Sequence, residues 1–221
     1  MQLQKYVLVT ALLILGLVLG SAEAQATAEA IIITNLVTNG SFETGTDPPT
    51  EYFRTLNAGE DSFDDISGWI VTGSVDWVAT YWTAQEGERS LDLSGSSIGA
   101  ISTTIDTSPE VTYLVTFYLA GNFEGGEETK RLKFTAGDAS ETFYFAKPTE
   151  WSTENMGWTK QTTTFTADDY STQLTFASLD NNAFGPALDN VTVGIVPLPP
   201  AALLLGSGLL GLLGWSRRKN K

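Results

Sequence analysis

Hydrophobic residues in the central part of the chain recur at every second position in short runs, and no helical period of useful length appears between residues 31 and 196. The runs are rich in β-branched and aromatic residues and are separated by Gly, Asn, Asp and Ser, a pattern typical of an all-β sandwich. Strands of this number and length can close a two-sheet jelly roll, so we predict a jelly-roll β-sandwich for residues 27–195. The predicted strands are 31–37, 69–72, 74–78, 90–93, 99–105, 111–120, 130–135, 141–145, 158–165, 171–177 and 188–195.

Some of these segments carry a more specific prediction. Residues 90–93 alternate polar and apolar, as in a half-buried strand, whereas both faces of residues 111–120 carry apolar side chains, as in a central strand. The Gly137-Asp138 pair predicts a hairpin between the two strands on either side of it. Residues 44–65 and 122–129 combine acidic residues with Pro or Gly, and we predict surface loops there.

The N-terminal segment has the features of a secretory signal peptide. Lys5 provides a basic start, residues 7–20 form an apolar region of about fourteen residues, and small residues at 21–26 fit a cleavage site. The apolar region is shorter than a membrane span requires. We therefore predict a signal peptide at 1–26, export through the Sec pathway, and a mature chain that starts at Gln25 or Thr27.

Residues 196–221 form a segment of three parts: a Val-Pro-x-Pro motif, an apolar run and a basic end. The run from 198 to 215 carries no charge, and as a helix it would extend roughly 27 Å, close to the hydrocarbon thickness of a bilayer. We predict a transmembrane helix at 198–215 with the domain outside, because the positive-inside rule keeps the basic end in the cytoplasm. That end consists of Arg217, Arg218, Lys219 and Lys221.

This segment resembles the PEP-CTERM sorting signal of exopolysaccharide-producing Gram-negative bacteria, and its motif is Val196, Pro197, Leu198 and Pro199. The commonest form of that signal has Glu where this chain has Leu198. The resemblance implies recognition by an exosortase-type transpeptidase at the inner membrane. Cleavage at or near Val196-Pro197 would then release the domain to the cell surface or the extracellular matrix. An ordinary anchor that is never cleaved is the alternative.

Composition excludes several kinds of function. Residues 27–196 hold 7 Lys and Arg against 25 Asp and Glu, a net charge of −18, which argues against a nucleic-acid partner. The acidity fits a bound cation, a neutral polymer as partner, or simply the surface of a secreted protein. The chain has no Cys and no His, which excludes disulfides, thiol catalysis, Ser-His-Asp chemistry and metal sites built on imidazole or thiolate.

Short segments that combine Gly, Asn and Asp with aromatic residues occur along the whole domain. They are Asn-Gly-Ser-Phe-Glu at 39–43, Gly-Trp at 68–69, Gly-Ser-Val-Asp at 73–76, Tyr-Trp at 81–82, Ser-Leu-Asp-Leu at 90–93, Leu-Ala-Gly-Asn at 119–122 and Gly-Pro-Ala-Leu-Asp-Asn-Val at 185–191. This ordered set resembles the "choice-of-anchor C" family of bacterial surface proteins, whose domain is similar to galactose-binding-like jelly rolls. The resemblance implies a structural calcium ion that joins the loop at 39–43 to the last strand. Its ligands here would be Glu43 and Asp189, since calcium takes hard oxygen ligands. In the alternative, these two carboxylates accept backbone N–H groups in turns.

Two further sets of residues are candidates for binding. Asp76 and Asp92 lie in predicted strands, either as additional metal ligands or as buried carboxylates that a neighbouring hydroxyl or amide satisfies. Aromatic rings with a polar edge suit stacking on sugars. We assign Trp69 to the core and select Tyr81, Trp82 and Trp151 as the candidate sugar-binding residues, with Trp82 and Trp151 expected to be exposed. No motif selects a carboxylate pair for glycoside hydrolysis.

The function expected from the sequence is that of an exported, non-enzymatic surface or matrix protein. Its partners would be the sorting enzyme and, transiently, the inner membrane. The alternative is a carbohydrate-binding module that holds exopolysaccharide.

Overall fold

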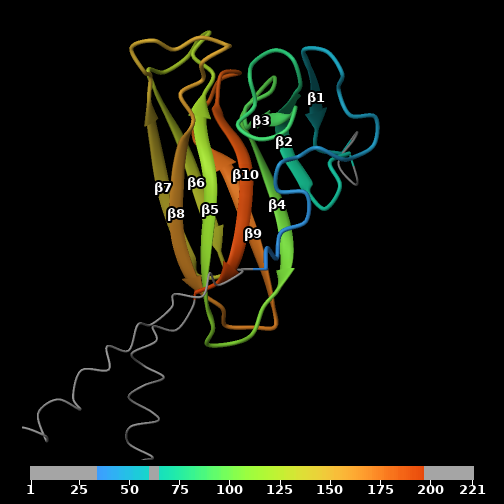
Figure 1. The fold of residues 1–221 in the computed structure, drawn as a ribbon, viewed down its shortest axis with the longest axis vertical. Coiled ribbons are helices and arrows are strands. Elements are labelled where there is room, and N and C mark those ends of the chain that lie inside the picture. The colour runs from blue at the N-terminus through green and yellow to red at the C-terminus, as the bar shows by residue number, and fades with distance from the viewer. Residues whose placement is uncertain (1–33, 60–64, 197–221) are drawn as a thin grey trace, which may run out of the picture. The chain divides into compact units, whose positions relative to one another are not determined.

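A computed structural model describes residues 34–59 and 65–196, and it is an all-β sandwich (Figure 1). The described strands are β1 (Phe53–Asn57), β2 (Ile70–Val78), β3 (Ser90–Asp92), β4 (Gly99–Asp106), β5 (Thr112–Gly121), β6 (Thr129–Ala136), β7 (Ala139–Ala146), β8 (Thr159–Thr166), β9 (Ser171–Ser178) and β10 (Pro186–Ile195).

All strand pairs are antiparallel, and β2 takes part in both layers of the sandwich. Residues 70–73 of β2 pair with β4, which continues through β9 and β6 to β7. Residues 74–78 pair with β1 and β3, and β3 leads through β10 and β5 to β8. The change of layer occurs at Gly73, whose φ of 71° lies in the left-handed region that suits glycine. A Cβ on Gly73 would lie 2.3 Å from the carbonyl oxygen of Ile98, so the two backbones meet too closely for a side chain.

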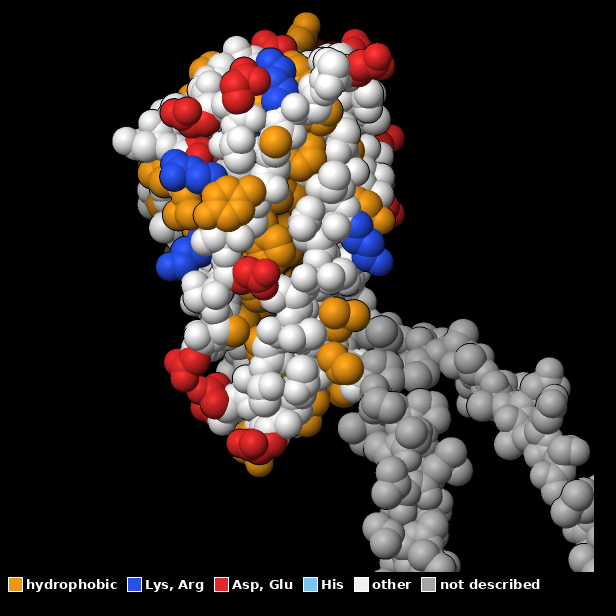
Figure 2. Space-filling model, turned by 90° about the vertical axis from the view of Figure 1, so that its left-hand side faces the viewer, with side chains coloured by type: hydrophobic (Ala, Val, Ile, Leu, Met, Phe, Trp, Pro, Cys, Tyr) orange, Lys and Arg blue, Asp and Glu red, His pale blue; other side chains and the backbone are white. Residues whose placement is uncertain are grey.

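Aromatic side chains join the two layers in the core. Phe117 of β5 lies 5.2 Å from Phe176 of β9 and 5.0 Å from Phe143 of β7, measured between ring centroids, and both pairs meet edge to face. Phe117 and Phe176 are fully buried. Edge-to-face pairs of this kind add to the stabilisation that comes from burying their apolar area. On the outside, acidic side chains are scattered over the face shown in Figure 2 rather than gathered in one patch.

The structure confirms much of the predicted strand pattern. The β6–β7 hairpin turns at Gly137 and Asp138, with Ala136 paired to Ala139. β5 has β10 on one side and β8 on the other, so it is a central strand as predicted. Residues 122–128 connect β5 to β6 without forming a strand, as expected of a loop.

Four predictions at the strand level are wrong. β1 forms inside the predicted loop at 44–65, and the predicted strands 69–72 and 74–78 form one strand, β2, which runs from Ile70 to Val78 through Gly73. All three residues of β3 are buried, so it is not half-buried, and it pairs with β2 on one side and β10 on the other. The described part of the predicted strand 31–37 is not a strand, although Leu36 N donates to Val193 O at 2.8 Å.

The predictions for the two end segments lie outside the described residues. They are the signal peptide at 1–26, the motif from Pro197 onward, the transmembrane helix at 198–215 and the basic end. Val196 is described, lies just after β10, and donates its N–H to Thr112 O at 3.0 Å. Within residues 34–59 and 65–196, no helix is long and apolar enough to cross a membrane.

Candidate functional site

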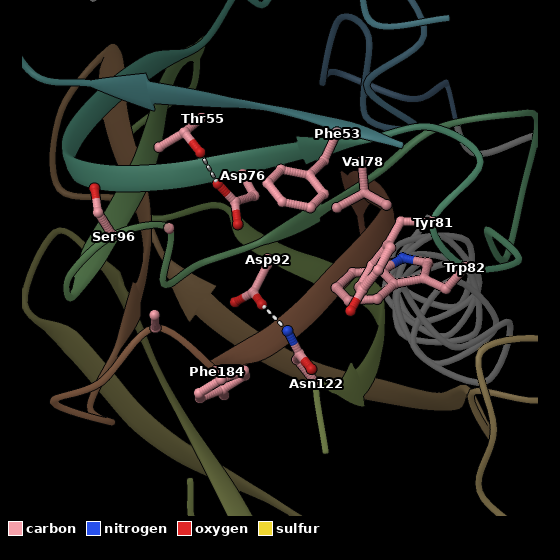
Figure 3. A pocket seen from close by; sticks show the side chains of 12 residues that line it. Phe53, Thr55, Asp76, Val78, Tyr81, Trp82, Asp92, Ser96, Asn122 and Phe184 are labelled. Carbon is pink, nitrogen blue, oxygen red and sulfur yellow. Dashed lines mark hydrogen bonds between the residues drawn. The ribbon is translucent and has the colours of Figure 1, made fainter. Parts of the chain in front are cut away.

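A pocket of about 250 Å³ opens where β1, β2 and β3 meet the loops that follow β5 and β9 (Figure 3). Both carboxyl groups of the pocket point into it, with aromatic rings around them. The residues that line the pocket are Phe53, Thr55, Asp76, Val78, Tyr81, Trp82, Asp92, Gly95, Ser96, Asn122, Ala183 and Phe184.

The two carboxyl groups face each other across neighbouring strands. Asp76 of β2 and Asp92 of β3 are directly paired in register, so their side chains project from the same face of the sheet. Asp76 is half-buried, and its Oδ1 accepts a hydrogen bond from the hydroxyl of Thr55 on β1. Burial raises the pKa of Asp76 above its ordinary value, and the Thr55 hydrogen bond partly opposes this.

Asp92 is the more buried of the two, with only 1% of its surface exposed. Its Oδ1 accepts the backbone N–H groups of Ser94 (2.9 Å) and Gly185 (3.0 Å), and its Oδ2 accepts the amide of Asn122 (2.9 Å). Burial raises the pKa of Asp92 to about 7, and the charge of Asp76 acts in the same direction. Of the two roles weighed for these aspartates, Asp92 has that of a buried carboxylate that an amide satisfies, and the half-buried Asp76 accepts a hydrogen bond from a hydroxyl.

Three aromatic side chains form a continuous wall of the pocket. Tyr81 packs edge to face on Phe53, with ring centroids 5.4 Å apart, and lies 5.8 Å from Trp82. Tyr81 is half-buried and Phe53 is exposed, so both rings offer accessible surface to the pocket. Burial raises the pKa of Tyr81, and the nearby carboxylate of Glu124 acts in the same direction.

The predicted exposure of Trp82 is wrong. Only 4% of its surface is exposed, and its Nε1 donates a hydrogen bond of 2.7 Å to the Ser90 hydroxyl inside the protein. Trp82 therefore packs against Tyr81 as a nearly fully buried ring among the residues that line the pocket. The sequence suggested exposure because its neighbours are polar, but the folded loop turns the indole inward.

Trp151 does not lie in the pocket. Its ring packs edge to face on Phe123 at a centroid distance of 5.7 Å, and the ammonium of Lys147 lies 5.8 Å from the centroid of the Trp151 ring. It is half-buried, and its indole N–H has no hydrogen-bond partner among the described residues. Tyr81 and Trp82 line the pocket, whereas Trp151 is not among its lining residues. Trp77 and Trp69 belong to the core, as was expected for Trp69.

A buried lysine holds the two loops that complete the pocket. Lys130 of β6 is fully buried, and its Nζ donates to the carbonyl oxygens of Gly125 and Phe184, both at 2.8 Å. Burial lowers the pKa of Lys130, whose ammonium also lies 5.1 Å from the centroid of the Phe123 ring. These contacts tie the loop after β5, which carries Asn122, to the loop after β9, which carries Phe184.

Glu43 and Asp189 converge on the loop at residues 85–89, and we call this pair the carboxylate clasp. Glu43 Oε1 accepts the backbone N–H groups of Glu88 (2.9 Å) and Arg89 (2.7 Å), and Glu43 Oε2 accepts Nη1 of Arg89 at 3.1 Å. Asp189 Oδ2 accepts the N–H groups of residues 85 (2.8 Å) and 86 (2.9 Å). Burial raises the pKa of Asp189 to about 7.

The clasp does not fit the ligand set of a calcium ion. Calcium takes six to eight oxygens, but the clasp oxygens already accept N–H donors, and Asp189 Oδ1 also accepts the N–H of Asn190 at 2.6 Å. Within the described ranges, no group of three or more acidic side chains is arranged to hold a metal ion. The arrangement corresponds to the alternative weighed from the sequence, in which both carboxylates accept backbone N–H groups. Calcium binding stays an untested prediction.

Sequence reasoning missed four residues that shape the pocket: Phe53, Thr55, Asn122 and Phe184. Two of them are on β1, whose five residues include a single fully buried side chain, Leu56, so their pattern gives little sign of a strand. The other two are in loops that contact through Lys130, a contact between residues far apart in the sequence.

Comparison with known proteins gives both a family and structural neighbours. Over 188 residues the chain is 34% identical to halomucin of Haloquadratum walsbyi (strain DSM 16790 / HBSQ001), an alignment that covers 79% of this chain, and the chain spans about 2% of the length of that relative. Among solved structures, TmCBM61 in complex with β-1,4-galactotriose has a TM-score of 0.45 at 16% identity and covers 74% of this chain and 99% of its own. A family 16 carbohydrate-binding module has a TM-score of 0.42 at 18% identity and covers 72% and 99%.

The sequence resemblances to PEP-CTERM and choice-of-anchor C proteins stay predictions, and the comparisons show a different family description. The model of the family described as "Protein of unknown function (DUF642)" matches residues 35–194, which is most of the chain and all but the last residue of the sandwich's strands. This chain therefore belongs to the DUF642 family.

Proposed function

We propose that the domain binds a carbohydrate in the pocket between β1, β2 and β3. A sugar ring presents apolar C–H groups on its faces and hydroxyl groups at its rim. The rings of Tyr81 and Phe53 offer the matching apolar surface, and the carboxyl groups of Asp76 and Asp92 offer hydrogen-bond acceptors for hydroxyl groups. The observation that carries the proposal is that both kinds of group line one pocket.

The geometry favours binding over glycoside hydrolysis. A hydrolase needs one carboxyl group that gives its proton to the leaving oxygen and a second that acts as base or nucleophile. Asp92 Oδ1 accepts two N–H groups and Oδ2 accepts a third, so this carboxyl group is fixed by the protein on both oxygens. Asp76 alone cannot supply both roles. The pocket therefore has the features of a binding site.

Affinity electrophoresis tests this proposal. The full chain is run in gels that contain the exopolysaccharide of the native host or one of a panel of plant and microbial polysaccharides. Tyr81→Ala removes a pocket ring, and Tyr170→Ala, which removes a tyrosine that is 74% exposed and does not line the pocket, is the matched control. We expect at least one polysaccharide to retard the wild type and Tyr170→Ala, and to retard Tyr81→Ala much less. Equal mobility of all three proteins in every gel would contradict the proposal.

We also propose that the protein is exported and sorted through its C-terminal segment. The support is the order of parts in residues 196–221: a Val-Pro-Leu-Pro motif, an uncharged apolar run over 198–215 and a basic end. The domain would then present its pocket at the cell surface or in the extracellular matrix. Intact-mass analysis of the protein from its native host tests this. A C-terminus near residue 197 would support sorting by a transpeptidase, whereas an intact Lys221 would show an anchor that is not removed.

A further inference from the structure

The pocket contains two acidic groups, Asp76 and Asp92, and no basic side chain in residues 34–59 and 65–196 forms an ion pair with either of them. Among the described residues, no lysine or arginine lines the pocket. Lys130 is a buried cation that interacts with Asp92, but its ammonium donates to the carbonyl oxygens of Gly125 and Phe184. Like charges on directly opposite residues of neighbouring strands destabilise a sheet. The pair is therefore an unfavourable feature of the free protein.

Both carboxyl groups keep acceptor capacity on the side of the pocket. A carboxylate oxygen can accept two hydrogen bonds. Asp92 Oδ2 accepts one, from Asn122, and the hydrogen bond from Thr55 goes to Oδ1 of Asp76. Among the described residues, no donor reaches Oδ2 of Asp76. The carboxylate of Glu124 also acts on Tyr81, because its charge adds to the effect of burial in raising the pKa of the Tyr81 hydroxyl.

The aromatic wall adds a second attraction for a cation. The faces of tyrosine, tryptophan and phenylalanine attract positive charge, most strongly where water is excluded. Tyr81 and Phe53 meet in the same pocket as the aspartate pair. An ammonium group there would donate hydrogen bonds to both aspartates and contact the rings, while the sugar ring that carries it would cover the apolar surface.

We infer that the pocket selects a sugar residue with a free, protonated amino group over the same sugar in its N-acetylated or neutral form. This inference rests on the proposed function and names its substrate class. A neutral hydroxyl group can donate to either aspartate but leaves the negative charge uncompensated. A protonated amine both donates and neutralises. Burial raises the pKa of both Asp76 and Asp92, and the charge of Asp76 adds to the rise at Asp92.

Three β-1,4-linked oligosaccharides of equal length test the inference: the oligomers of glucosamine, N-acetylglucosamine and glucose. They differ only in the group on carbon 2 of each ring. Titration calorimetry with the full chain near neutral pH measures each affinity. We expect the glucosamine oligomer to bind at least about tenfold more tightly than the other two, the factor that one additional favourable contact of about 1.4 kcal/mol provides.

A matched pair of variants separates the pocket from the general acidity of the protein. Asp76→Asn keeps the oxygen that accepts the Thr55 hydrogen bond but removes the charge. Asp138→Asn removes the same charge from the exposed turn of the β6–β7 hairpin. We expect Asp76→Asn to bring the affinity ratio close to one and Asp138→Asn to leave it unchanged. Thermal unfolding of both variants verifies that they are folded.

Two outcomes would overturn the inference, and they differ in what they say of the proposed function. If the glucose or N-acetylglucosamine oligomer binds as tightly as the glucosamine oligomer, the selectivity is refuted and carbohydrate binding stands. An equal loss of the ratio in Asp76→Asn and Asp138→Asn would likewise refute the role of the pocket. If no oligosaccharide binds and no polysaccharide retards the protein, both the inference and the proposed function fall.

Discussion

The Asp92→Asn substitution tests whether Asp92 is a buried group that titrates, because it should change the pH dependence of the free energy of unfolding. The pKa of Asp92 is raised from 3.8 to about 7 in the folded protein. The folded state therefore binds the proton more tightly than the unfolded state. It follows that this group contributes stability that is fully present below pH 3.8 and is lost as the pH rises through about 7. The asparagine side chain of the variant does not titrate, so the variant lacks this contribution.

The size of this pH-dependent stability follows from the change in the pKa of Asp92 on folding. A change of one pKa unit corresponds to 1.36 kcal/mol, so a rise of about three units is worth about 4 kcal/mol over the whole range. Between about pH 5 and about pH 8, linkage gives roughly 2 to 3 kcal/mol of that amount.

Urea unfolding of the wild type and of Asp92→Asn at these two pH values measures the effect. The wild type should lose roughly 2 to 3 kcal/mol more stability than the variant on going from the lower to the higher pH. The substitution also disturbs hydrogen bonds, but these do not titrate. They change the free energy of unfolding of the variant by the same amount at both pH values, so they do not affect its pH dependence. Asp189 also has a pKa of about 7, but it is present in both proteins and cancels too. Parallel pH dependences in the two proteins would refute the assignment of a buried, titrating Asp92.

Three further outcomes are expected. EDTA and added calcium should leave the Tm unchanged, because the carboxylate clasp accepts N–H groups on its oxygens; a rise of Tm with calcium would instead support the predicted ion. In urea unfolding, Gly73→Ala should cost about 2 to 5 kcal/mol, since it combines a left-handed φ with a backbone clash. Gly59→Ala shares the positive φ but has open space around it, and should cost about 1 kcal/mol; equal losses would argue against the clash at Gly73. Trp82→Phe should lower the free energy of unfolding by about 1 to 3 kcal/mol, because the buried Ser90 hydroxyl loses the hydrogen bond that it accepts from Trp82. If the variant has normal stability but no longer binds polysaccharide, Trp82 stacks on the sugar instead.

The fold was largely predictable because strand periodicity is a local property. The alternation in β6 and β7 and the Gly137-Asp138 turn between them identify a hairpin without knowledge of anything else in the chain. β1 was not predicted because it is a short strand in which most side chains are not fully buried. Among the described strands it pairs with β2 alone. β2 continues through Gly73 because its first half pairs with β4 and its second half pairs with β1 and β3. The local sequence pattern gives no sign of these pairings.

The candidate site was predictable only in part, since it depends on contacts across the fold. Asp76 and Asp92 were noticed as acidic residues inside predicted strands. The sequence left open whether they bind a metal or accept hydrogen bonds from the protein, because their partners Thr55 and Asn122 are distant in the chain. Tyr81 was selected from the sequence as a candidate for stacking on a sugar, and it lines the pocket. Trp151 has polar neighbours in sequence, as Trp82 does, but the fold places it against Phe123 and Lys147.

The position of β10 determines how the domain would carry a mechanical load. β10 lies between β3 and β5, and its ladder with β5 extends to Ile195, next to Val196. The hydrogen bonds of an antiparallel pair are perpendicular to the strands. A force applied at Val196 along β10 therefore stretches many of these bonds at once, in shear, whereas a force across the sheet would separate them one after another. A sandwich tethered through residue 196 is thus strongest against tension that is directed along its last strand.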